Sequence, residues 1–344
     1  MQVRENVPLA PLTTFEVGGP ARWFVEASCE EEVAEAARWA RNHSLPLFVL
    51  GGGSNLLVAD AGFDGLVLRV RLEGVAQKGE LFQAAAGEDW DGFVTLAVER
   101  GYAGVECLAG IPGTVGGTPV QNVGAYGQEV GAAIDRVRAF DLVEMRFVEF
   151  GKGACGFGYR RSRFNSSDRG RFVVTRVDYR LKQGGVPLLA YADLKLHFNE
   201  RAAKPSLSEV AAAVRRIRQT KGMLMVEGEA DCRSAGSFFK NPSVSQETAA
   251  RVRETAAGAG VPLRVYPAAD GTVKIPAAWL IEQSGFRKGY ARGAAGISSR
   301  HTLALINRGG ATAAEIVALA EEIRAGVNAR FGIYLEMEPV RVGF

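Results

Sequence analysis

The chain contains 344 residues, of which 47% are hydrophobic and 23% are charged, and it carries a formal net charge of +3. These values are typical of a globular protein with two or three domains. Lys and Arg are scattered along the sequence, which argues against nucleic acid as a partner. No apolar run of about 18 residues predicts a membrane span, and the N-terminus, MQVRENVPLAP, lacks the apolar core of a signal peptide. We therefore expect a cytoplasmic protein.

Cysteine and histidine usage argues against two further classes. The four cysteines form no C-x-x-C pair, which predicts free thiols, and the three histidines lie far apart without carboxylate spacing. A His-based metal site and a Ser-His-Asp hydrolase are therefore not expected. These residues are Cys29, Cys107, Cys155, Cys232, His43, His197 and His301.

The N-terminal region predicts a strand–helix–strand unit. Residues 12–27 indicate a turn at Gly18-Gly19-Pro20 followed by a strand. Ser28 and Glu31 form a capping-box pattern for a helix that ends near Asn42. Residues 46–50 (PLFVL) then predict a short buried strand that leads into a glycine turn, an order common in nucleotide-binding folds.

The glycine turn GGGSNLL at residues 51–57 matches neither of the common phosphate-binding motifs. A G-x-G-x-x-G motif would require glycine at position 56, where the chain has Leu56, and no G-x-x-x-x-G-K-[ST] motif occurs anywhere. Ser54 and Asn55 are small polar residues that suit phosphate or ring oxygens. The alternative interpretation is an ordinary turn at the end of a strand.

A second glycine-rich stretch, LAGIPGTVGGTPVQNVGAYG, occupies residues 108–127. Glycine lets the backbone approach a ligand closely, and the absence of charged side chains makes main-chain N–H groups the expected polar contacts, as around a pyrophosphate. Two such loops suggest one cofactor held between them, whereas a glycine-rich surface turn is the alternative. Before the stretch, we expect short strands between residues 62 and 86 and a helix over 89–101, with Trp90, Phe93, Val94 and Ala97 on its apolar face.

The central region predicts further strands and an arginine-rich turn. Residues 134–150 alternate like a β-hairpin, and residues 171–181 like another strand. Between them, GFGYRRSRF at 156–164 places Tyr159 and Arg160 in a glycine-flanked segment. Arginine makes planar, two-toothed contacts with carboxylate or phosphate. For the neighbouring Arg161 and Arg163, a solvated basic turn is the default interpretation.

Residues beyond 184 predict an exposed aromatic residue and a capped helix. Tyr191 is the exposed aromatic candidate. Ser206 and Glu209 predict the start of a helix that runs to about Thr220, and Lys221-Gly222 closes it. Residues 222–233 predict an irregular loop.

The segment SAGSFFKNP at residues 234–242 flanks Ser237 with glycine and two phenylalanines. A serine hydroxyl is a poor acid in water, so a catalytic role requires a positioned, water-poor setting, which the aromatic rings would supply. A turn that packs two phenylalanines is the equal alternative.

The remainder of the chain alternates helix and strand, with elements expected at 245–257, 261–267, 276–284 and 301–307. Thr312 and Glu315 predict a capped helix over 313–329. A strand over 333–340 then places Glu336 and Glu338 on one face, where solvent-exposed edge carboxylates are the usual explanation.

These segments, in this order, resemble the UDP-N-acetylenolpyruvoylglucosamine reductase family of flavoenzymes, which act in peptidoglycan precursor synthesis and thereby in cell-wall formation, cell shape and division. The resemblance covers nearly the whole chain. Each segment alone is weak, but the ordered set is highly specific. It consists of GGPA at 18–21, GGGSNLL at 51–57, IPGTVGG…QNVGAYG at 111–127, GYRRSRF at 158–164, AGSFFKNP at 235–242 and GIYLEMEPV at 332–340.

The resemblance implies an α+β fold of the vanillyl-alcohol-oxidase type, in which two α+β subdomains hold FAD and a smaller C-terminal α+β domain binds substrate. We expect the first FAD-binding subdomain at 1–70, the second at 71–203 and the substrate domain at 204–331. The C-terminal strand at 332–344 would return to the first subdomain or to the active site. The implied state is a monomer that binds neither membrane nor nucleic acid.

The resemblance also implies the reaction and its cofactor. NADPH reduces a non-covalently bound FAD, and UDP-N-acetylglucosamine enolpyruvate then receives a hydride from flavin N5 at C3 and a proton at C2, giving UDP-N-acetylmuramate. The implied FAD contacts are Gly51, Gly52, Gly53, Ser54, Asn55 and Leu56 in the first loop, and Ile111, Pro112, Gly113, Thr114, Gly116, Gly117, Gln121, Asn122, Gly124, Ala125 and Tyr126 in the second.

By the same resemblance, Arg160 stabilises charge on the substrate carboxylate, Ser237 donates the proton and Glu338 completes the site. We favour Glu338 over Glu336 because Glu-Pro-Val fits the family ending better. Arg161 departs from the family, many members of which have aspartate there. The implied substrate contacts are Tyr159, Tyr191, Lys221 and Asn241, and Tyr191 makes this the longer of the family's two types, with a substrate-covering loop.

Two other functions fit parts of the sequence. An FAD-dependent alcohol oxidase or dehydrogenase of the same fold would tether its flavin through His or Cys, and Cys107 is the only such residue close to either loop. A nucleotide-sugar or pyrophosphate-binding protein without redox chemistry would also use glycine loops. Flavin absorbance of the purified protein separates this last possibility from the others.

Overall fold

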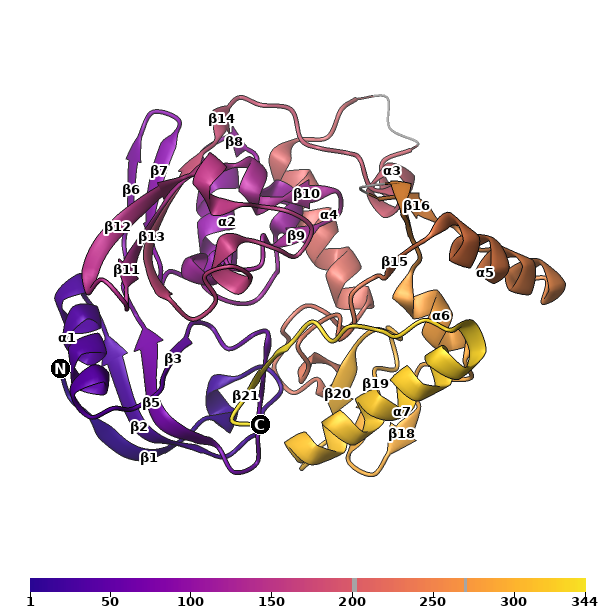
Figure 1. The fold of residues 1–344 in the computed structure, drawn as a ribbon. Helices are drawn as coiled ribbons and strands as arrows, with labels where there is room; N and C mark the ends of the chain where they lie inside the picture. Colours follow the sequence, from indigo (N-terminus) through magenta and orange to yellow (C-terminus); the bar gives the residue numbers. More distant parts are fainter. Residues whose placement is uncertain (200–202, 269–270) are drawn as a thin grey trace. The chain divides into compact units, whose positions relative to one another are not determined.

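The computed structural model describes residues 1–199, 203–268 and 271–344 as a mixture of helices and strands (Figure 1). The chain forms two compact units. The first contains residues 1–8, 20–53 and 63–220, and the second contains 9–19, 54–62 and 221–344. Helix α4 (Leu207–Thr220) belongs by its contacts to the first unit, although we expected it in the substrate domain. The division into subdomains at residue 70 stays a prediction.

The first sheet of the first unit has the strand order β1-β2-β5-β3, and its last three strands run parallel. Helix α1 (Glu30–Asn42) packs on this sheet through a stripe of buried Val and Ala residues. Cys29 is its N-cap, so the third helical residue is Glu32. Its carboxylate, and not that of Glu31 as we expected, accepts from the backbone and hydroxyl of Ser28. The strands are β1 (Arg4–Pro8), β2 (Pro20–Ala27), β5 (Phe63–Val70) and β3 (Leu47–Leu50).

The second sheet of the first unit is antiparallel throughout, in the order β12-β11-β13-β7-β6. The predicted hairpin and strands are confirmed there as β11 (Ile134–Asp141), β12 (Arg146–Gly151), β13 (Phe172–Arg180), β7 (Leu81–Ala85) and β6 (Val75–Lys78). Helix α2 (Trp90–Glu99) begins where the Asp89 side chain accepts from Gly92 N–H. Its apolar face buries Trp90 and Phe93 against Tyr179.

Smaller elements complete the first unit. Ser206 and Glu209 form the predicted cap of α4, which ends before Gly222 at φ +64°. The other elements are β8 (Tyr102–Ala103), β9 (Gly124–Ala125), β10 (Gln128–Glu129), β14 (Lys182–Gln183) and α3 (Ala192–His197).

The second unit packs α6 (Ala277–Gln283) and α7 (Ala313–Phe331) with the sheet β18-β19-β20 around a core that contains Phe238 and Phe239. Thr312 and Glu315 form the predicted capping box of α7. β4 pairs in parallel with the C-terminal β21. The remaining elements are β4 (Leu56–Val58), β15 (Ser243–Val244), α5 (Gln246–Gly258), β16 (Tyr266–Pro267), β17 (Val273–Lys274), β18 (Ala291–Arg292), β19 (Ala295–Ile297), β20 (Leu305–Asn307) and β21 (Val340–Val342).

Three predicted strands of the second unit are shorter than expected. Residues 261–267 contribute only β16, and residues 301–307 only β20. Residues 333–340 form one bridge, Met337 with Phe239, before β21 begins at Val340. Pro262 and Pro339 lack the N–H that a ladder requires, which limits pairing before β16 and before β21.

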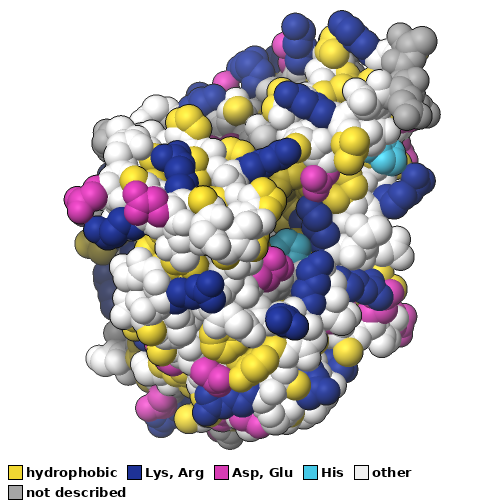
Figure 2. Space-filling view, turned by 90° about the vertical axis from the view of Figure 1, so that its right-hand side faces the viewer, with side chains coloured by type: hydrophobic (Ala, Val, Ile, Leu, Met, Phe, Trp, Pro, Cys, Tyr) yellow, Lys and Arg dark blue, Asp and Glu magenta, His cyan; other side chains and the backbone are white. Residues whose placement is uncertain are grey.

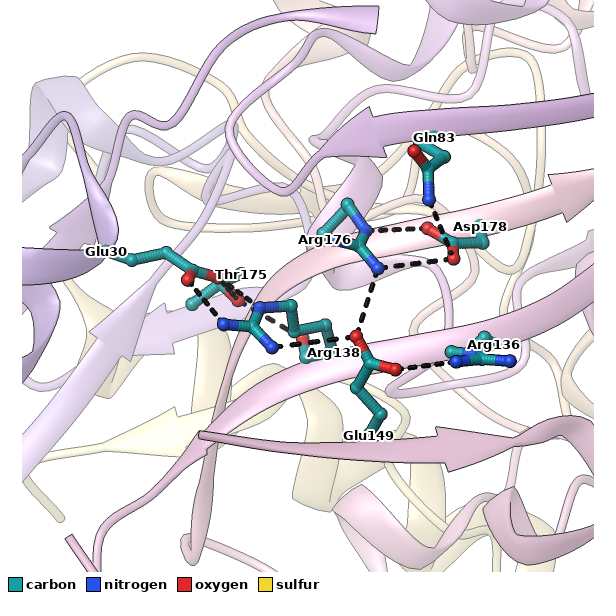
Figure 3. A network of polar contacts seen from close by, with 8 residues as sticks. All are labelled: Glu30, Gln83, Arg136, Arg138, Glu149, Thr175, Arg176 and Asp178. Atoms are coloured by element: carbon teal, nitrogen blue, oxygen red, sulfur yellow. Dashed lines mark hydrogen bonds and ion pairs between the residues drawn. The ribbon is translucent and has the colours of Figure 1, made fainter. Parts of the chain in front are cut away.

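A network of charged side chains connects α1 to the second sheet (Figure 3). Arg138 of β11 donates two hydrogen bonds to Glu30, of 2.8 and 2.9 Å, and Thr175 donates a third of 2.6 Å. Glu149 on β12 accepts from Arg136 at 2.7 Å and from Arg176 at 3.1 Å. The network therefore fixes the α1 layer against the five-stranded sheet. Its members are Glu30, Gln83, Arg136, Arg138, Glu149, Thr175, Arg176 and Asp178.

The network lowers the pKa of two of its carboxyl groups. Burial alone raises the pKa of Glu30, but the hydrogen bonds from Arg138 and Thr175 and the charges of Arg138 and Arg176 bring it below 4.5. The hydrogen bond from Arg136 lowers the pKa of Glu149. A depressed folded-state pKa stabilises the fold fully above the unfolded pKa, and the stabilisation is lost as the pH falls through the folded value.

Replacing Glu30 with Gln tests this linkage. We expect Glu30→Gln to lower the free energy of unfolding by about 1–2 kcal/mol at pH 7, because a charge-assisted, two-toothed contact is lost. The difference from wild type should shrink as the pH falls from 4.5 through the lowered pKa of folded Glu30, below which wild-type Glu30 is also neutral. Urea denaturation at several pH values measures it. Glu31→Gln, at an exposed position of the same helical turn, is the control. A pH-independent loss would contradict the linkage.

Candidate functional site

The two predicted cofactor loops contact each other within the first unit, and glycine residues form the contact. A Cβ atom added to Gly52 would lie 2.5 Å from Cα of Gly113, and one added to Gly51 would lie 2.8 Å from Oγ1 of Thr114. The atoms of Gly113 that this Cβ would meet belong to the backbone, which cannot move away as a flexible side chain would. Gly53 and Gly113 also take positive φ values, +67° and +126°. The loops therefore form a side-chain-free cradle, which suits a diphosphate-containing cofactor.

The second loop is fixed to the connection between β7 and α2. Val115 N–H donates to Glu88 O at 2.9 Å, Gly116 N–H to Ala86 O at 2.8 Å, and Trp90 N–H to Gly113 O at 3.1 Å. A Cβ on Gly116 would lie 2.6 Å from Cβ of Ala86. These contacts hold the loop in one conformation before any ligand binds.

The boundary between the compact units runs through the first loop, between Gly53 and Ser54. In the second unit, Asn55 Nδ2 donates to Glu338 O at 3.2 Å, and Val340 N–H donates to Asn55 O at 2.9 Å. Asn55 and Leu56 therefore hold the C-terminal segment that carries Glu338. Their predicted contacts with FAD stay a prediction.

The end of the second loop lies against Tyr191. The rings of Tyr126 and Tyr191 meet edge-on with centroids 5.4 Å apart. Tyr126 is buried, whereas Tyr191 is 41% exposed, as predicted. The structure thus brings one predicted cofactor residue and one predicted substrate residue together within the first unit.

Arg218 is a residue near this loop that the sequence analysis missed. Its Nε donates to Gly110 O at 2.9 Å, and burial lowers its pKa, although the charges of Tyr126 and Asp91 act in the opposite direction. The signal was available in the sequence, because Arg218 continues the apolar stripe of α4 four residues after Val214. A buried guanidinium beside a glycine loop is a candidate source of positive charge for an anionic ligand.

Tyr159 and Arg160 occupy the centre of a tight turn. Gly158 N–H donates to Arg161 O at 2.9 Å, and Arg161 N–H donates back to Gly158 O at 3.1 Å. Arg160 has φ +53°, which is rare for a residue with a side chain. Strained backbone of this kind is found preferentially at functional sites.

In the second unit, the segments of Ser237 and Glu338 lie side by side. Phe238 N–H donates to Leu303 O, and Glu338 N–H donates to Phe238 O, both at 2.8 Å. Phe238 and Phe239 are 1% exposed and follow Ser237 directly. Ser237 itself is half-buried, so the water-poor setting that a serine acid requires stays a prediction.

The two C-terminal glutamates differ in their surroundings. Glu336 is 70% exposed and pairs with Lys240 Nζ at 2.5 Å, whereas Glu338 is half-buried. This difference supports Glu338 as the catalytic candidate. Nearby, Asn241 Oδ1 accepts from Ala277 N–H at 2.8 Å, so its carboxamide also holds the start of α6.

Lys221 lies in a cationic cluster that the sequence analysis missed. Burial, together with the charges of Lys221 and Lys288, lowers the pKa of His301 to about 4. His301 Nδ1 accepts from Leu303 N–H at 3.0 Å, so the neutral ring carries its proton on Nε2. On the face drawn in Figure 2, Lys and Arg side chains are spread among apolar and acidic ones. The spacing of the three cluster residues in the sequence gives no signal of their proximity.

Cys107, the candidate for a covalent flavin link, is a buried thiol. Burial and the charge of Glu106 raise its pKa to about 12, and its Sγ contacts Leu188 O at 3.2 Å. A thiol rather than a thiolate is a poor nucleophile, which disfavours the tethered-oxidase alternative. Among the described residues, no cluster of His, Cys, Asp and Glu could hold a metal ion, and no helix is both long and apolar enough to cross a bilayer.

Comparison with known proteins identifies the class to which this geometry belongs. The model of a family described as "FAD binding domain" matches residues 21–146, which include both loops. The chain is therefore an FAD-binding protein. A second model, "UDP-N-acetylenolpyruvoylglucosamine reductase, C-terminal domain", matches residues 228–342. The predicted fold, an FAD-binding part with a separate C-terminal domain, is confirmed.

Relatives that match this chain over nearly its whole length carry the name of that second family. A protein from Streptomyces coelicolor named UDP-N-acetylenolpyruvoylglucosamine reductase is 46% identical, and the match covers 100% of this chain and 91% of that protein. A protein of the same name from Nocardia farcinica is 47% identical, and the match covers 99% of this chain and 90% of that protein. The crystal structure of UDP-N-acetylenolpyruvylglucosamine reductase from Thermus caldophilus has a TM-score of 0.70 and 28% identity, with 99% of each chain covered. The chain belongs to the UDP-N-acetylenolpyruvoylglucosamine reductase family.

A methyl group on Gly52 tests the cradle. We expect Gly52→Ala to weaken FAD binding about tenfold or more, because the added Cβ meets the backbone of Gly113. Flavin absorbance per chain and FAD titration of the apoprotein measure this effect. Gly153→Ala, where an added Cβ meets nothing within 4 Å, is the matched control. Equal FAD affinity in the two variants would show that the close approach of the loops does not matter for the cofactor.

Proposed function

We propose that this FAD-dependent oxidoreductase uses NADPH to reduce UDP-N-acetylglucosamine enolpyruvate to UDP-N-acetylmuramate in peptidoglycan precursor synthesis. The observation that carries the proposal is the 46% identity to a reductase of this name over the whole chain. The glycine cradle supports it, because FAD requires backbone close to its diphosphate. We further propose a monomeric, cytoplasmic enzyme.

The cradle residues fit FAD, and their own hydrogen bonds narrow the expected contacts. The N–H groups of Gly116 and Gly117 donate within the protein, to Ala86 O and Thr114 O. We therefore assign the diphosphate chiefly to Gly51, Gly52 and Gly53 and to the backbone around Gly113. FAD held by these residues would supply the hydride-transfer chemistry that links NADPH to C3 of the substrate.

Arg160 binds the substrate carboxylate in this proposal. Hydride addition at C3 places negative charge on that carboxylate, and a fixed guanidinium stabilises charge where it develops. The guanidinium carbon of Arg160 lies 5.5 Å from the ring centre of Tyr159, which is 40% exposed and available to a ligand. Tyr159 thus orients the arginine and contacts the substrate.

Ser237 donates the proton to C2, and Glu338 completes the proton path. Ser237 is half-buried and is followed by the buried Phe238 and Phe239, so bound substrate would displace the remaining water from its hydroxyl, which favours transfer from serine to the substrate rather than exchange with solvent. The hydrogen bond from Glu338 N–H to Phe238 O fixes the two segments relative to each other. Glu338 then restores the proton to Ser237, directly or through water.

The remaining candidates bind the nucleotide sugar. Lys221 and Lys288 supply positive charge beside a neutral His301 N–H, a combination that suits a diphosphate. Asn241 offers its amide beside α6. Tyr191, exposed at the end of the second loop, covers the substrate as in the longer type of the family.

The Ser237→Ala variant tests the proton donor. Reduction of the flavin by NADPH should continue at the wild-type rate, whereas turnover of the enolpyruvyl substrate should fall by several orders of magnitude, because the acid is absent. Anaerobic stopped-flow absorbance separates the two half-reactions. Ser243→Ala, at an exposed position of β15, is the control. Near-normal turnover in Ser237→Ala would remove Ser237 from the mechanism.

Removing the charge of Lys221 tests the cationic cluster. In Lys221→Met, the pKa of His301 should rise from about 4, because a repulsive charge is gone, and should stay below 6.5 because burial remains. The KM for the nucleotide sugar should rise about tenfold, with a smaller change in kcat. NMR titration of the imidazole and steady-state kinetics measure the two effects. An unchanged KM together with a shifted pKa would leave the cluster without a role in binding.

A further inference from the structure

The turn that carries Arg160 is held by side chains from two directions. Asn165 Nδ2 donates to Arg160 O at 3.1 Å, and Asn122 Nδ2 donates to Gly158 O at 2.9 Å. Both acceptors belong to the turn itself, one at Arg160 and one two residues before it. Because Arg160 adopts φ +53°, these bonds hold a conformation that the residue does not prefer by itself.

Ser162 joins the turn to the second glycine loop. Its Oγ donates to Val120 O at 2.7 Å, and its N–H donates to Asn165 Oδ1 at 2.9 Å. The Ser162 side chain is completely buried. Asn122, which belongs to the loop and is 1% exposed, makes the contact in the reverse direction with Gly158. Two hydrogen bonds therefore connect the second glycine loop with the Arg160 turn.

The carboxamide of Asn122 is largely occupied by protein partners. Besides Gly158 O, its Nδ2 donates to Glu129 Oε2 at 2.8 Å, and its Oδ1 accepts from Gly131 N–H at 2.8 Å. An amide can take part in four hydrogen bonds, and three are made here. This geometry favours a role of the Asn122 side chain in shaping the loop rather than in direct contact with FAD.

Gly124 of the same loop leaves space for Arg160. A Cβ atom at Gly124 would lie 3.2 Å from the Nη1 atom of Arg160 and 3.0 Å from Cγ of Glu129. The guanidinium thus lies directly against the backbone of the cofactor loop. A shift of the loop at Gly124 would therefore change the backbone surface that the Arg160 guanidinium contacts.

We infer that Asn122, Ser162 and Asn165 are positioning residues for Arg160, and we name these three side chains the arginine lock. The lock stabilises the unfavourable turn and fixes its position relative to the second glycine loop. One set of hydrogen bonds therefore positions both the guanidinium and the loop that we assign to the cofactor. The inference rests on the proposed function, because the role of Arg160 comes from it.

The substitution Asn165→Asp separates positioning from simple fold stability. Aspartate keeps the oxygen that accepts from Ser162 N–H, so the cap of this short helical turn survives. It loses the N–H that donates to Arg160 O. Ser162→Ala, which removes the bond to Val120 O and also the oxygen that accepts from Phe164 N–H, is the second variant should Asn165→Asp fold poorly. Ser167→Ala, exposed in the same segment, is the control.

We expect Asn165→Asp to slow the substrate-reducing half-reaction about 100-fold, while FAD content and flavin reduction by NADPH stay within about twofold of wild type. Amide hydrogen exchange in residues 158–165 should accelerate, because the turn opens more often. The control should match wild type in every measurement. A uniform loss of FAD binding and both half-reactions would overturn the inference, as would wild-type kinetics together with wild-type exchange.

Failure of the proposed function has a different signature. In that case wild-type enzyme reduced by NADPH would not be reoxidised by the enolpyruvyl nucleotide sugar. Amide hydrogen exchange would then test whether the lock stabilises the turn, without a measurement of turnover. Faster exchange at 158–165 in both lock variants but not in Ser167→Ala supports it, and unchanged exchange overturns it.

Discussion

The close approach of two backbones, at Gly51-Gly52 and at Gly113-Thr114, is the constraint on which the rest of the first unit depends. An added Cβ at Gly52 would come within 2.5 Å of Gly113, so the approach requires glycine. The first loop is placed by the end of β3 in a parallel sheet, and the second by hydrogen bonds to the start of α2. Two sheets of different topology must therefore stay in register for one cradle to exist.

Two polar networks stabilise the first unit, one between α1 and the second sheet and one between the second glycine loop and the Arg160 turn, and they differ in burial. The Glu30–Arg138 network lies partly in solvent, where charged pairs keep much of their hydration, and it joins α1 to the second sheet (Figure 3). In the arginine lock, Asn122 and Ser162 are buried and Asn165 is half-buried, and their amide and hydroxyl groups are less costly to bury than charges. The lock is consequently less sensitive to pH than the outer network, whose carboxylates titrate in acid.

The sequence predicts the features that depend on neighbouring residues and misses those that depend on distant ones. The caps at Ser206 and Thr312 and the burial of Trp90 and Phe93 are local, and they are confirmed. The cap partner of Ser28 was wrong by one residue because the helix starts at Glu30. The cationic cluster at His301, the lock role of Asn122 and the division of GGGSNLL between the units all arise from contacts tens to hundreds of residues apart.

The residues that we assign to reacting atoms are held by backbone geometry, and the two tyrosines that we assign to the substrate are exposed. Arg160 is fixed by carbonyl contacts at its own turn, and Ser237 and Glu338 are fixed through the backbone of buried Phe238. Tyr159 and Tyr191 keep 40% and 41% of their surface in solvent. Chemistry requires groups placed before the substrate arrives, because reorganisation during the reaction adds to the barrier. Peripheral contacts can form on binding at a cost in affinity alone, so the side chains of Tyr159 and Tyr191 need not be fixed before the substrate arrives.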